Sequence, residues 1–366
     1  MPWPRWTGAS LQTGWRTLVP LVVGGTVALV LAGTLTAGAS DAPPRRTAAE
    51  LLAGLDRVDV AGYSGTVVQK STLLDDVPAG ATGLSLARLM SGSNTIKVWY
   101  GGEDRQRIAV LDATGESDLF RDGDQVWQWD STKRVAVQSV ANQSDVEQAP
   151  IPVDGTTVTP DDLARQTVAA IDPDTEVRVA APGRVAGRSA YQLVLTPSEA
   201  SGTRIGRVVL WLDGDTRMPL AAQVFARGIT REPSIDLSFT QIAFEVPEDE
   251  AFRFVPPRGA SIKTYNSAGG DADIASSPDP LLGLRRTTTT GTSWTRVAVI
   301  TPPNTSDESR TATTAQFGDR LTAVSGAWGS GKLLETDNGL LTMLFVSDGR
   351  IVVGAVAPDA LYAALG

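Results

Sequence analysis

The side chains that most often carry chemistry are missing from this sequence, whose 366 residues include no cysteine and no histidine. Disulfides, thiolate and imidazole metal ligands, cysteine nucleophiles and Ser-His-Asp triads are therefore excluded. Pairs of carboxylates remain, and two acids are enough for glycoside hydrolysis. The candidates are Asp75-Asp76, Asp161-Asp162 and Glu248-Asp249-Glu250. We interpret them as surface charges or helix-start acids, and we predict no catalytic residue, no metal site, no cofactor and no enzymatic activity.

One glycine-rich segment, Gly326 to Lys332, matches the G-x-x-x-x-G-K pattern of a phosphate-binding loop. The residue after it is Leu333, where magnesium binding needs Ser or Thr. A Gly-rich turn between two strands explains the pattern better. Asp213 and Asp215 are likewise better explained by a β-turn, where acids are common, than by a calcium site.

The charge balance narrows the choice of partners. The net charge is −9 at pH 7, so the chain offers no basic stripe for phosphates and we predict no nucleic-acid partner. Arginine far outnumbers lysine in a background rich in Ala, Gly, Thr and Val, which suggests a high-GC bacterial gene.

Residues 18–35 form an uncharged apolar run that follows three tryptophans. Its length lies between the roughly 7–15 residues of a signal-peptide core and the roughly 17–25 of a spanning helix. Residues 37–39, Ala-Gly-Ala, would suit a signal peptidase, whereas the tryptophans favour a retained anchor. We expect residues 1–16 to be a cytoplasmic arm and 17–39 to be a signal anchor or a signal peptide. The main domain is then extracytoplasmic, either on a single-pass protein of the cell membrane or secreted or periplasmic after cleavage.

The elements that follow alternate between short helices and many strands. Thr47 and Glu50 form a capping box that opens a helix ending at Gly62, and residues 63–70 read as a strand. Residues 71–94 carry scattered leucines among Gly, Pro and Ser, as in a surface insertion or a mobile apolar lid. A meander of Gly-separated strands then predicts an antiparallel sheet, with strands at 95–100, 105–112, 116–121, 125–130 and 134–139.

A second helix and a second group of strands complete the sheet. The helix is predicted at 161–171, started by Thr159 and Pro160. Strands follow at 176–181, 184–197, 207–213, 219–227 and 234–244, with a bulge near residues 240–242 where the alternation slips.

The sequence motifs of the predicted strands in residues 184–227 resemble those of a known family. A V-x-G-R-x-A-Y-x-L-x-L-x-P strand at 185–197, L-W-x-D at 210–213 and Pro-Leu at 219–220 are similar to segments of the extracytoplasmic LolA/RseB-like proteins, lipoprotein carriers and MucB/RseB-type regulators of sigma-E signalling. The resemblance covers about residues 47–260. It implies an α+β fold with a bent, incompletely closed antiparallel sheet, a half-barrel covered by helices, around an apolar cavity for lipid.

The rest of the chain is divided into a linker at 264–293 and a small β-rich C-terminal subdomain at 294–366. Strands are predicted at 294–300, 333–346 and 349–356, with a terminal helix at 358–365. Because about 70 residues bury little core alone, this extension is expected to dock on the main domain or to form a small satellite subdomain.

Residues that would line the implied cavity are apolar or aromatic, and the sequence offers Leu84, Leu86, Leu89, Trp99, Trp127, Trp129, Tyr191, Leu193, Leu210 and Trp211. For the tryptophans, the alternative is core packing against the helix at 161–171.

Three functions remain open. The first is a membrane-tethered carrier or chaperone that binds lipid or lipoprotein acyl chains. The second is an RseB-like regulator that senses envelope stress through a membrane anti-sigma factor. The third is a structural envelope domain without a ligand.

Overall fold

The computed structural model describes residues 42–55, 60–75, 90–102, 104–111, 115–140, 159–265, 286–301, 311, 314–315 and 317–366. Ala42–Gly366 form one compact unit. The predicted anchor at 17–39 and the leucines Leu84, Leu86 and Leu89 lie outside the described residues. Within these ranges, no helix combines the length and the apolar character needed to cross a membrane.

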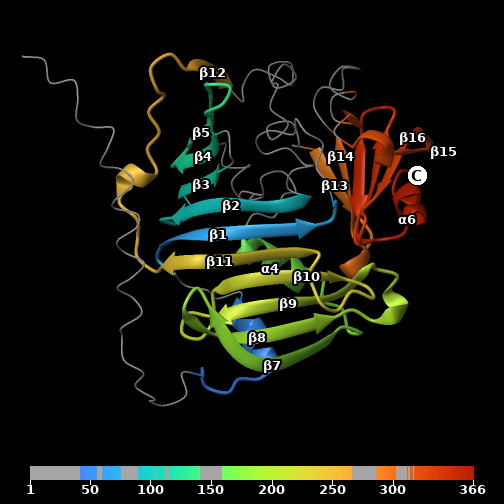
Figure 1. Ribbon diagram of the computed structural model, residues 1–366, viewed down its shortest axis with the longest axis horizontal. Coiled ribbons are helices and arrows are strands. Elements are labelled where there is room, and N and C mark those ends of the chain that lie inside the picture. The colour runs from blue at the N-terminus through green and yellow to red at the C-terminus, as the bar shows by residue number, and fades with distance from the viewer. Residues whose placement is uncertain are drawn as a thin grey trace, which may run out of the picture. The chain divides into compact units, whose positions relative to one another are not determined.

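A twelve-stranded sheet dominates the fold, in the order β12-β6-β5-β4-β3-β2-β1-β11-β10-β9-β8-β7 (Figure 1). The first meander contains β1 (Tyr63–Thr72), β2 (Ser91–Tyr100), β3 (Arg105–Leu111), β4 (Glu116–Asp122), β5 (Gln125–Asp130) and β6 (Val135–Val140). The second contains β7 (Glu176–Val185), β8 (Arg188–Thr196), β9 (Ile205–Asp213), β10 (Pro219–Ala226) and β11 (Ile235–Ala243). The sheet ends with β12 (Ser261–Tyr265), which pairs with β6 and is the parallel neighbour in this sheet.

The two meanders join where β1 pairs with β11, and β12 and β7 stand at opposite ends of the strand order. The sheet is therefore open, as predicted. Register shifts occur between β1 and β11, between β9 and β10, and between β7 and β8. At the first of these, Thr66 pairs with Gln241 and Val67 with Phe239, so Thr240 is the extra residue. Such bulges bend and twist strands, and the predicted bulge at 240–242 is confirmed.

Two helices pack against one face of the sheet, which we call the inner face. In α1 (Ala48–Leu55), the predicted capping box is formed: Thr47 N donates to Glu50 Oε2 at 2.7 Å and Glu50 N donates to Thr47 Oγ1 at 3.3 Å. In α4 (Pro160–Ala169), Pro160 occupies the first turn, where its missing N–H costs nothing. This helix packs against β9, β10 and β11, and it connects the two meanders.

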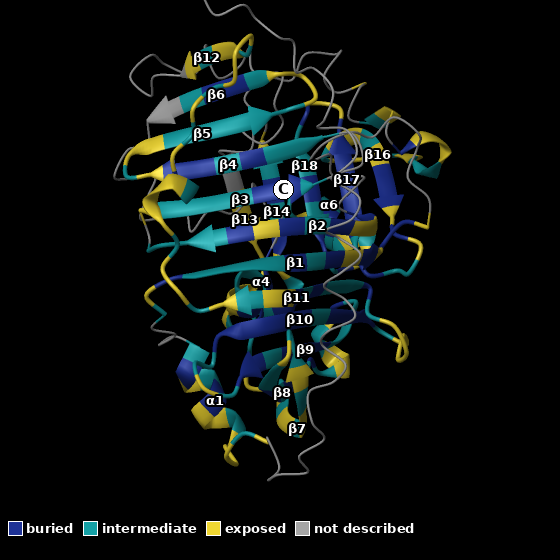
Figure 2. Ribbon diagram, turned by 60° about the vertical axis from the view of Figure 1, so that its left-hand side comes forward, coloured by how far each residue is buried: buried dark blue, intermediate teal, exposed yellow. Residues whose placement is uncertain are grey.

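A second, six-stranded sheet has the order β13-β14-β18-β17-β16-β15 and is antiparallel throughout. Its strands are β13 (Arg286–Thr290), β14 (Val297–Thr301), β15 (Thr322–Gly326), β16 (Gly329–Glu335), β17 (Thr342–Val346) and β18 (Ile351–Gly354), and α6 (Pro358–Ala363) packs against β17 and β18. Buried residues run along β10 in the large sheet and along β17 in the small one (Figure 2). The small sheet thus has a core of its own, which includes Val299, Leu344 and Leu361.

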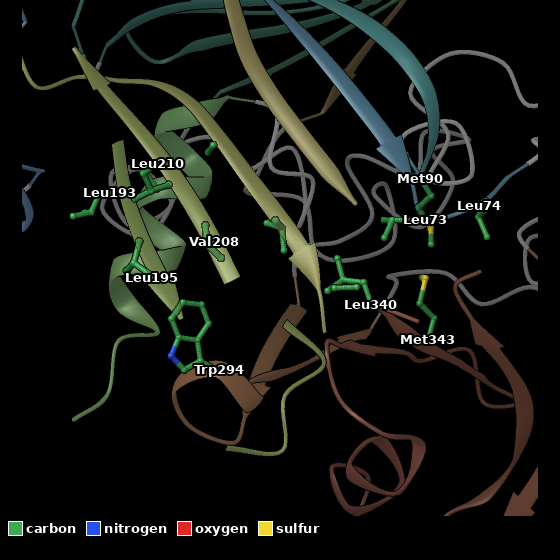
Figure 3. Close-up of a cluster of buried hydrophobic side chains, with 14 of the residues drawn as sticks. Leu73, Leu74, Met90, Leu193, Leu195, Val208, Leu210, Trp294, Leu340 and Met343 are labelled. Atoms are coloured by element: carbon green, nitrogen blue, oxygen red, sulfur yellow. The ribbon is translucent and has the colours of Figure 1, made fainter. Parts of the chain in front are cut away.

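The small sheet also shares a core with the large one, which we call the junction core. Leu193, Leu195, Val208 and Leu210 of the large sheet belong to the same buried cluster as Trp294, Leu340 and Met343, and so do Leu73, Leu74 and Met90 (Figure 3). Tyr191 is a further member. Hydrogen bonds fix the contact at two places. Asp337 N donates to Leu73 O at 2.9 Å, and Arg204 N donates to Ala355 O at 2.7 Å. The expected docking of the extension is therefore observed.

Several element boundaries differ from the prediction. The stretch 184–197 is split by a turn at Ala186 and Gly187, both with positive φ (50° and 76°), so residues 184–185 end β7 and β8 begins at Arg188. The strand β2 begins at Ser91, inside the expected insertion. Residues 261–265 and 286–290, at the two ends of the expected linker, form β12 and β13. The expected strand at 333–346 is two strands, β16 and β17.

Candidate functional site

A pocket of about 130 Å³ lies between the inner face of β1–β3 and the start of α4. Seven of its thirteen wall residues are apolar or aromatic, and the other six are polar residues from α4, its N-cap and the sheet. The wall consists of Val60, Tyr63, Val98, Trp99, Tyr100, Ile108 and Met218, and of Gln106, Arg107, Thr159, Asp161, Asp162 and Arg165.

Aromatic side chains pack against one another at the floor of the pocket. The rings of Tyr63 and Tyr100 stack with centroids 5.3 Å apart, and Phe239 meets Tyr63 edge-on at 6.2 Å. Gly65 makes this arrangement feasible, since a Cβ at that position would lie 2.7 Å from the Phe239 ring. Phe239 itself is buried in a cluster with Val67, Ile96, Val98 and Leu237. The floor is therefore continuous with the core beneath it.

The polar side of the pocket is built by the start of α4. Thr159 is the N-cap residue: its hydroxyl accepts from Asp162 N at 3.2 Å and donates to Asp162 Oδ2 at 2.6 Å. Arg165, one turn along, forms an ion pair with Asp161. The capping box and the ion pair fix the directions of these charged side chains at the pocket wall.

Burial raises the pKa values of the carboxyl groups of Asp161 and Asp162. It raises the pKa of Asp162 to about 6, an effect that the hydrogen bond from Thr159 and the charge of Arg165 reduce and the nearby Asp161 increases. Burial also raises the pKa of Asp161, against the charge and hydrogen bond of Arg165. The pKa of Tyr63 is raised as well, by burial and then by the two aspartates. The wall therefore loses negative charge under mildly acidic conditions, while its arginines stay charged.

The predicted role of the tryptophans does not match this geometry. Register places Trp99, Arg107, Phe120 and Trp127 opposite one another across β2–β5, on the outer face, while Val98 and Ile108 point to the inner face with α4. The alternative for the tryptophans, packing against the helix at 161–171, does not hold for Trp127 and Trp129. Their rings contact Phe254 instead, at 5.4 and 5.8 Å between centroids. Trp99 borders the pocket, but its side chain belongs to the outer face.

The outer face holds a compact polar-aromatic arrangement of its own. The guanidinium of Arg107 lies between the rings of Trp99 and Phe120, at 4.6 and 4.5 Å from their centroids. Its Nη2 donates to Asp118 Oδ1 at 2.7 Å. Burial raises the pKa of Asp118 to about 6, although the hydrogen bond and charge of Arg107 act in the opposite direction. Both flat faces of the guanidinium contact aromatic rings, and its N–H group bonds to Asp118 inside the protein. We therefore interpret this cluster as structural.

The remaining predicted site residues lie in cores or near them. Tyr191, Leu193 and Leu210 are buried in the junction core, and Tyr191 Oη donates to Pro44 O at 2.7 Å. Trp211 is half-buried against Gly183, where a Cβ would lie 2.7 Å from its ring. Of the ten predicted lining residues, the pocket wall includes Trp99, whereas Leu84, Leu86 and Leu89 lie outside the described residues.

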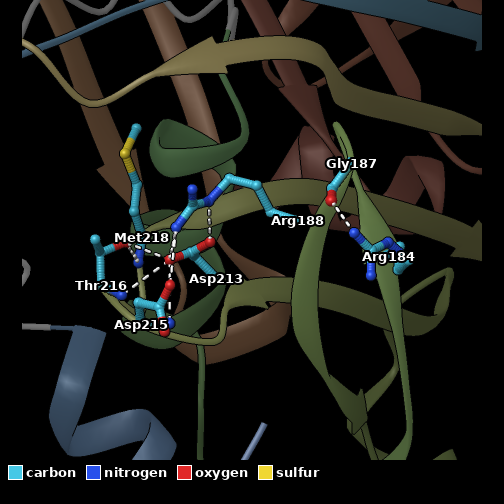
Figure 4. A network of polar contacts seen from close by, with 7 residues as sticks. All are labelled: Arg184, Gly187, Arg188, Asp213, Asp215, Thr216 and Met218. Atoms are coloured by element: carbon cyan, nitrogen blue, oxygen red, sulfur yellow. Dashed lines mark hydrogen bonds and ion pairs between the residues drawn. The ribbon is translucent and has the colours of Figure 1, made fainter. Parts of the chain in front are cut away.

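The calcium and phosphate candidates have structural explanations. Asp213 is buried and accepts from Arg188 Nε at 2.5 Å and from Thr216 N at 2.9 Å, with Asp215 also paired to Arg188 (Figure 4). Burial alone would raise the pKa of Asp213, but the hydrogen bonds from Arg188 and Thr216 outweigh it and lower the pKa. The described ranges contain no cluster of acids suited to a metal ion. The glycine-rich segment from Gly326 is the β15–β16 hairpin, as predicted.

Sequence reasoning missed the residues that build the pocket, above all Tyr63, Tyr100, Ile108 and Arg165. A usable signal was present, since a capped helix with two acids in its first turn follows an alternating sheet. The crossover that places this helix start over β1–β3, however, is visible in the topology and not in local periodicity.

Comparisons with known proteins rest on structure. No family model matches the sequence, and no curated protein matches it. The Pseudomonas aeruginosa MucA/MucB complex is similar with a TM-score of 0.45 and 17% identity, covering 87% of this chain and 96% of that one. A LolA superfamily protein from Nitrosomonas europaea is similar with a TM-score of 0.25 and 13% identity, covering 57% of this chain and 99% of that one.

An open antiparallel sheet, bent by bulges and with helices on one face, is the architecture that the resemblance predicts, and it is the architecture observed. The protein has an α+β fold, a large open antiparallel sheet with helices on one face and a small β-rich C-terminal extension.

Proposed function

We propose that this protein is an extracytoplasmic binding protein for a lipid or an acylated protein, acting as a carrier or chaperone in the cell envelope, and that it is not an enzyme. The observation that carries the proposal is the pocket on the inner face, where Val98, Tyr100 and Ile108 lie opposite the charged start of α4. An apolar floor with a polar wall on one side suits an amphipathic ligand. Each methylene group buried there contributes about 0.8 kcal/mol, so an acyl chain needs no charged partner.

The size of the pocket limits how the ligand binds. Small-molecule pockets usually measure roughly 300–1,000 Å³, and this one measures about 130 Å³. It therefore holds one end of an acyl chain, and the remainder of the ligand must lie along the sheet.

The place of action follows from the N-terminal segment. We propose that residues 17–39 hold the protein in the cell membrane as a single-pass anchor, with residues 47–260 as the lipid-binding domain and 294–366 as its C-terminal subdomain outside the cytoplasm. A tethered carrier cannot diffuse between two membranes, so it would hand its ligand over locally. Cleavage at residues 37–39 would instead release it.

Native mass spectrometry tests the proposal. The full chain, with a protease site inserted before Ala42, is produced in bacteria so that it is exposed to membrane lipids. The released unit is purified without detergent, and its mass is measured before and after lipid extraction. A discrete added mass of lipid size is expected. Ile108→Ser should reduce the bound fraction, whereas Ile229→Ser, at an exposed apolar residue remote from the pocket wall (39% exposed), should not. An apo mass with no uptake of added acyl compounds would contradict the proposal.

A second candidate is an RseB-like regulator that binds a membrane anti-sigma factor and releases it when lipid or a misfolded lipoprotein arrives. The feature that favours it is the six-stranded sheet joined to the large one through the junction core, because a large domain with a smaller C-terminal part resembles these regulators more than the single-domain carriers. Calorimetric titration with the extracytoplasmic part of an anti-sigma factor encoded beside this gene separates the candidates. Binding that added lipid reverses would support the regulator, and no binding would support the carrier.

A further inference from the structure

The most exposed large apolar side chains of the described chain lie near the β12 end of the large sheet. Val255 is 81% exposed and Ile262 is 56% exposed, the two highest values among the large hydrophobic residues that the structure describes. One exposed aliphatic residue needs no explanation, but several at one place mark a surface that binds a protein or a membrane. Pro256 and Pro257 stiffen the chain directly after Val255, so the exposure is built into a rigid segment.

Both residues belong to the outer face. Ile262 pairs with Ala136 and Ala136 pairs with Trp129, so Ile262 and Trp129 point to the same face, two strand spacings or about 10 Å apart. The ring of Trp129 contacts Phe254, the residue before Val255. The described part of β12 is largely exposed (Figure 2). Two half-buried aromatic rings therefore lie between the two exposed aliphatic side chains.

The charge around these residues is opposite in sign to that of the whole chain. Residues 131–140 and 251–264 lie side by side through the pairing of β6 with β12, and together they contain five Lys or Arg and no Asp or Glu. The complete chain carries −9. An anionic surface repels such a chain as a whole, so it can bind only where positive charge is concentrated.

Two of the arginines lie beside Ile262. Arg134 Nη2 donates to Arg258 O at 2.6 Å, and Ser261 N donates to Arg134 O at 2.9 Å. The exposed side chain of Arg258 forms no hydrogen bond or ion pair within the described ranges. Of the other cations, Lys133 is paired with Asp130 at 3.0 Å. We call Arg134, Val255, Arg258 and Ile262 the outer corner.

We propose that the outer corner docks on an anionic lipid membrane, with Val255 and Ile262 inserted among the headgroups and the two arginines bound to lipid phosphates. Basic residues beside apolar ones suit such a surface, because arginine keeps its charge at the headgroups while its stem lies along apolar atoms. Tryptophan, here Trp129, also favours membrane interfaces. A membrane is favoured over an acidic protein because the most exposed side chains are aliphatic, whereas the centres of protein interfaces are rich in aromatic anchors.

This surface goes beyond the proposed function, because none of its four residues belongs to the pocket wall. Co-sedimentation with vesicles tests it. The Ala42–Gly366 unit, a single compact unit, is mixed with vesicles of phosphatidylcholine alone or with about 30% phosphatidylglycerol. Binding to the anionic vesicles should be at least about tenfold stronger, and it should fall about tenfold when NaCl rises from about 50 to about 500 mM.

Charge substitutions place the binding on the molecule. Arg258→Gln should weaken binding about fivefold and leave the fold intact, since the structure uses the carbonyl of this residue. Adding Arg134→Asn should weaken binding about fivefold more; asparagine suits the positive φ of 55° at this position. The matched control is Arg231→Gln with Arg296→Gln, which removes the same charge from exposed positions distant from β12 and should bind as the wild type does.

Apolar substitutions supply the second readout. Val255→Ser with Ile262→Ser should weaken binding about tenfold at both salt concentrations, because the inserted aliphatic groups are lost. Val179→Ser with Ile229→Ser is the matched control, at side chains that are 37% and 39% exposed. Melting temperatures of all variants should stay near that of the wild type, since exposed side chains contribute little to stability.

Three results would overturn the proposal. They are equal binding to both kinds of vesicle, loss of binding in the control variants equal to that in the outer-corner variants, and no binding to vesicles at all. In the last case, binding of polyglutamate that Arg258→Gln weakens would assign the outer corner to an acidic protein partner instead. Each of these results leaves acyl-ligand binding in the pocket to its own test.

Discussion

Replacing Asp162 with asparagine should stabilise the protein at neutral pH and leave its stability unchanged in acid. Burial raises the pKa of this carboxyl from 3.8 to about 6. The folded state therefore holds the proton more tightly than the unfolded state does. The stability that this tighter proton binding by Asp162 contributes is fully present below pH 3.8 and is lost as the pH rises through about 6.

The size of the effect follows from the same values. One pKa unit corresponds to about 1.36 kcal/mol, so the rise to about 6 sets an upper limit of about 3 kcal/mol at pH 7. Part of this is offset, because a charged acid at a helix start contributes about 0.3–1 kcal/mol that asparagine lacks. Solvent near the half-buried side chain lowers it further. We expect a gain of about 1–2 kcal/mol in the free energy of unfolding at pH 7.

Urea unfolding of the Ala42–Gly366 unit at pH 4, 5, 6 and 7 measures this difference. The control is Glu199→Gln, which removes one negative charge from a side chain that is 97% exposed. The difference between Asp162→Asn and the wild type should grow from pH 4 to pH 7. A variant less stable than the wild type at pH 7, or a difference that shrinks as the pH rises, would refute the reasoning that burial dominates this acid.

Three further outcomes are expected. Phe254→Ala should lower the free energy of unfolding by about 2 kcal/mol, less than the roughly 3–5 kcal/mol of a fully buried Phe. It should also shift the fluorescence emission of Trp127 to the red, because the ring that contacts Trp127 is lost. Unchanged fluorescence would contradict this contact. Leu340→Ala should cost about 2–5 kcal/mol and should speed hydrogen exchange in the six-stranded sheet, because this side chain is 1% exposed in the junction core; a loss of stability without faster exchange there would argue against docking. Asp213→Asn should cost roughly 1.5–3 kcal/mol by removing the charge-assisted hydrogen bond from Arg188, which keeps its ion pair with Asp215. Since the pKa of Asp213 is lowered, the loss should be largest at neutral pH and shrink below pH 3.8; thermal melts across that range test it.

The sequence predicts the elements well where the signal is local. The caps at Thr47 and Thr159 depend on residues three positions apart, and the bulge at Thr240 is visible as a slip in alternation. The turn at residues 186–187 was missed because residues on both sides favour strands, and only the positive φ of Ala186 and Gly187 reveals it. The strand β12 was missed because its pairing with β6 is parallel and distant in sequence.

The site is less predictable, for a physical reason. Alternation shows that Val98 and Trp99 face opposite ways, but it does not show which face the helices cover. The aromatic residues were therefore assigned to the ligand, whereas α4 covers the face of Val98.

The pairing of β1 with β11 sets the order in which this protein can fold. Thr240 Oγ1 donates to Thr66 O across 174 residues of chain. Strands β2–β6 are joined by short turns, and with β1 they can assemble as the chain emerges N-terminus first, but β1 keeps an unpaired edge until the second meander has followed. Contacts of such long range slow folding and leave strand edges exposed to aggregation. The middle of the sheet is therefore completed late, and a chaperone that shields the β1 edge would speed folding more than one acting on either end of the sheet.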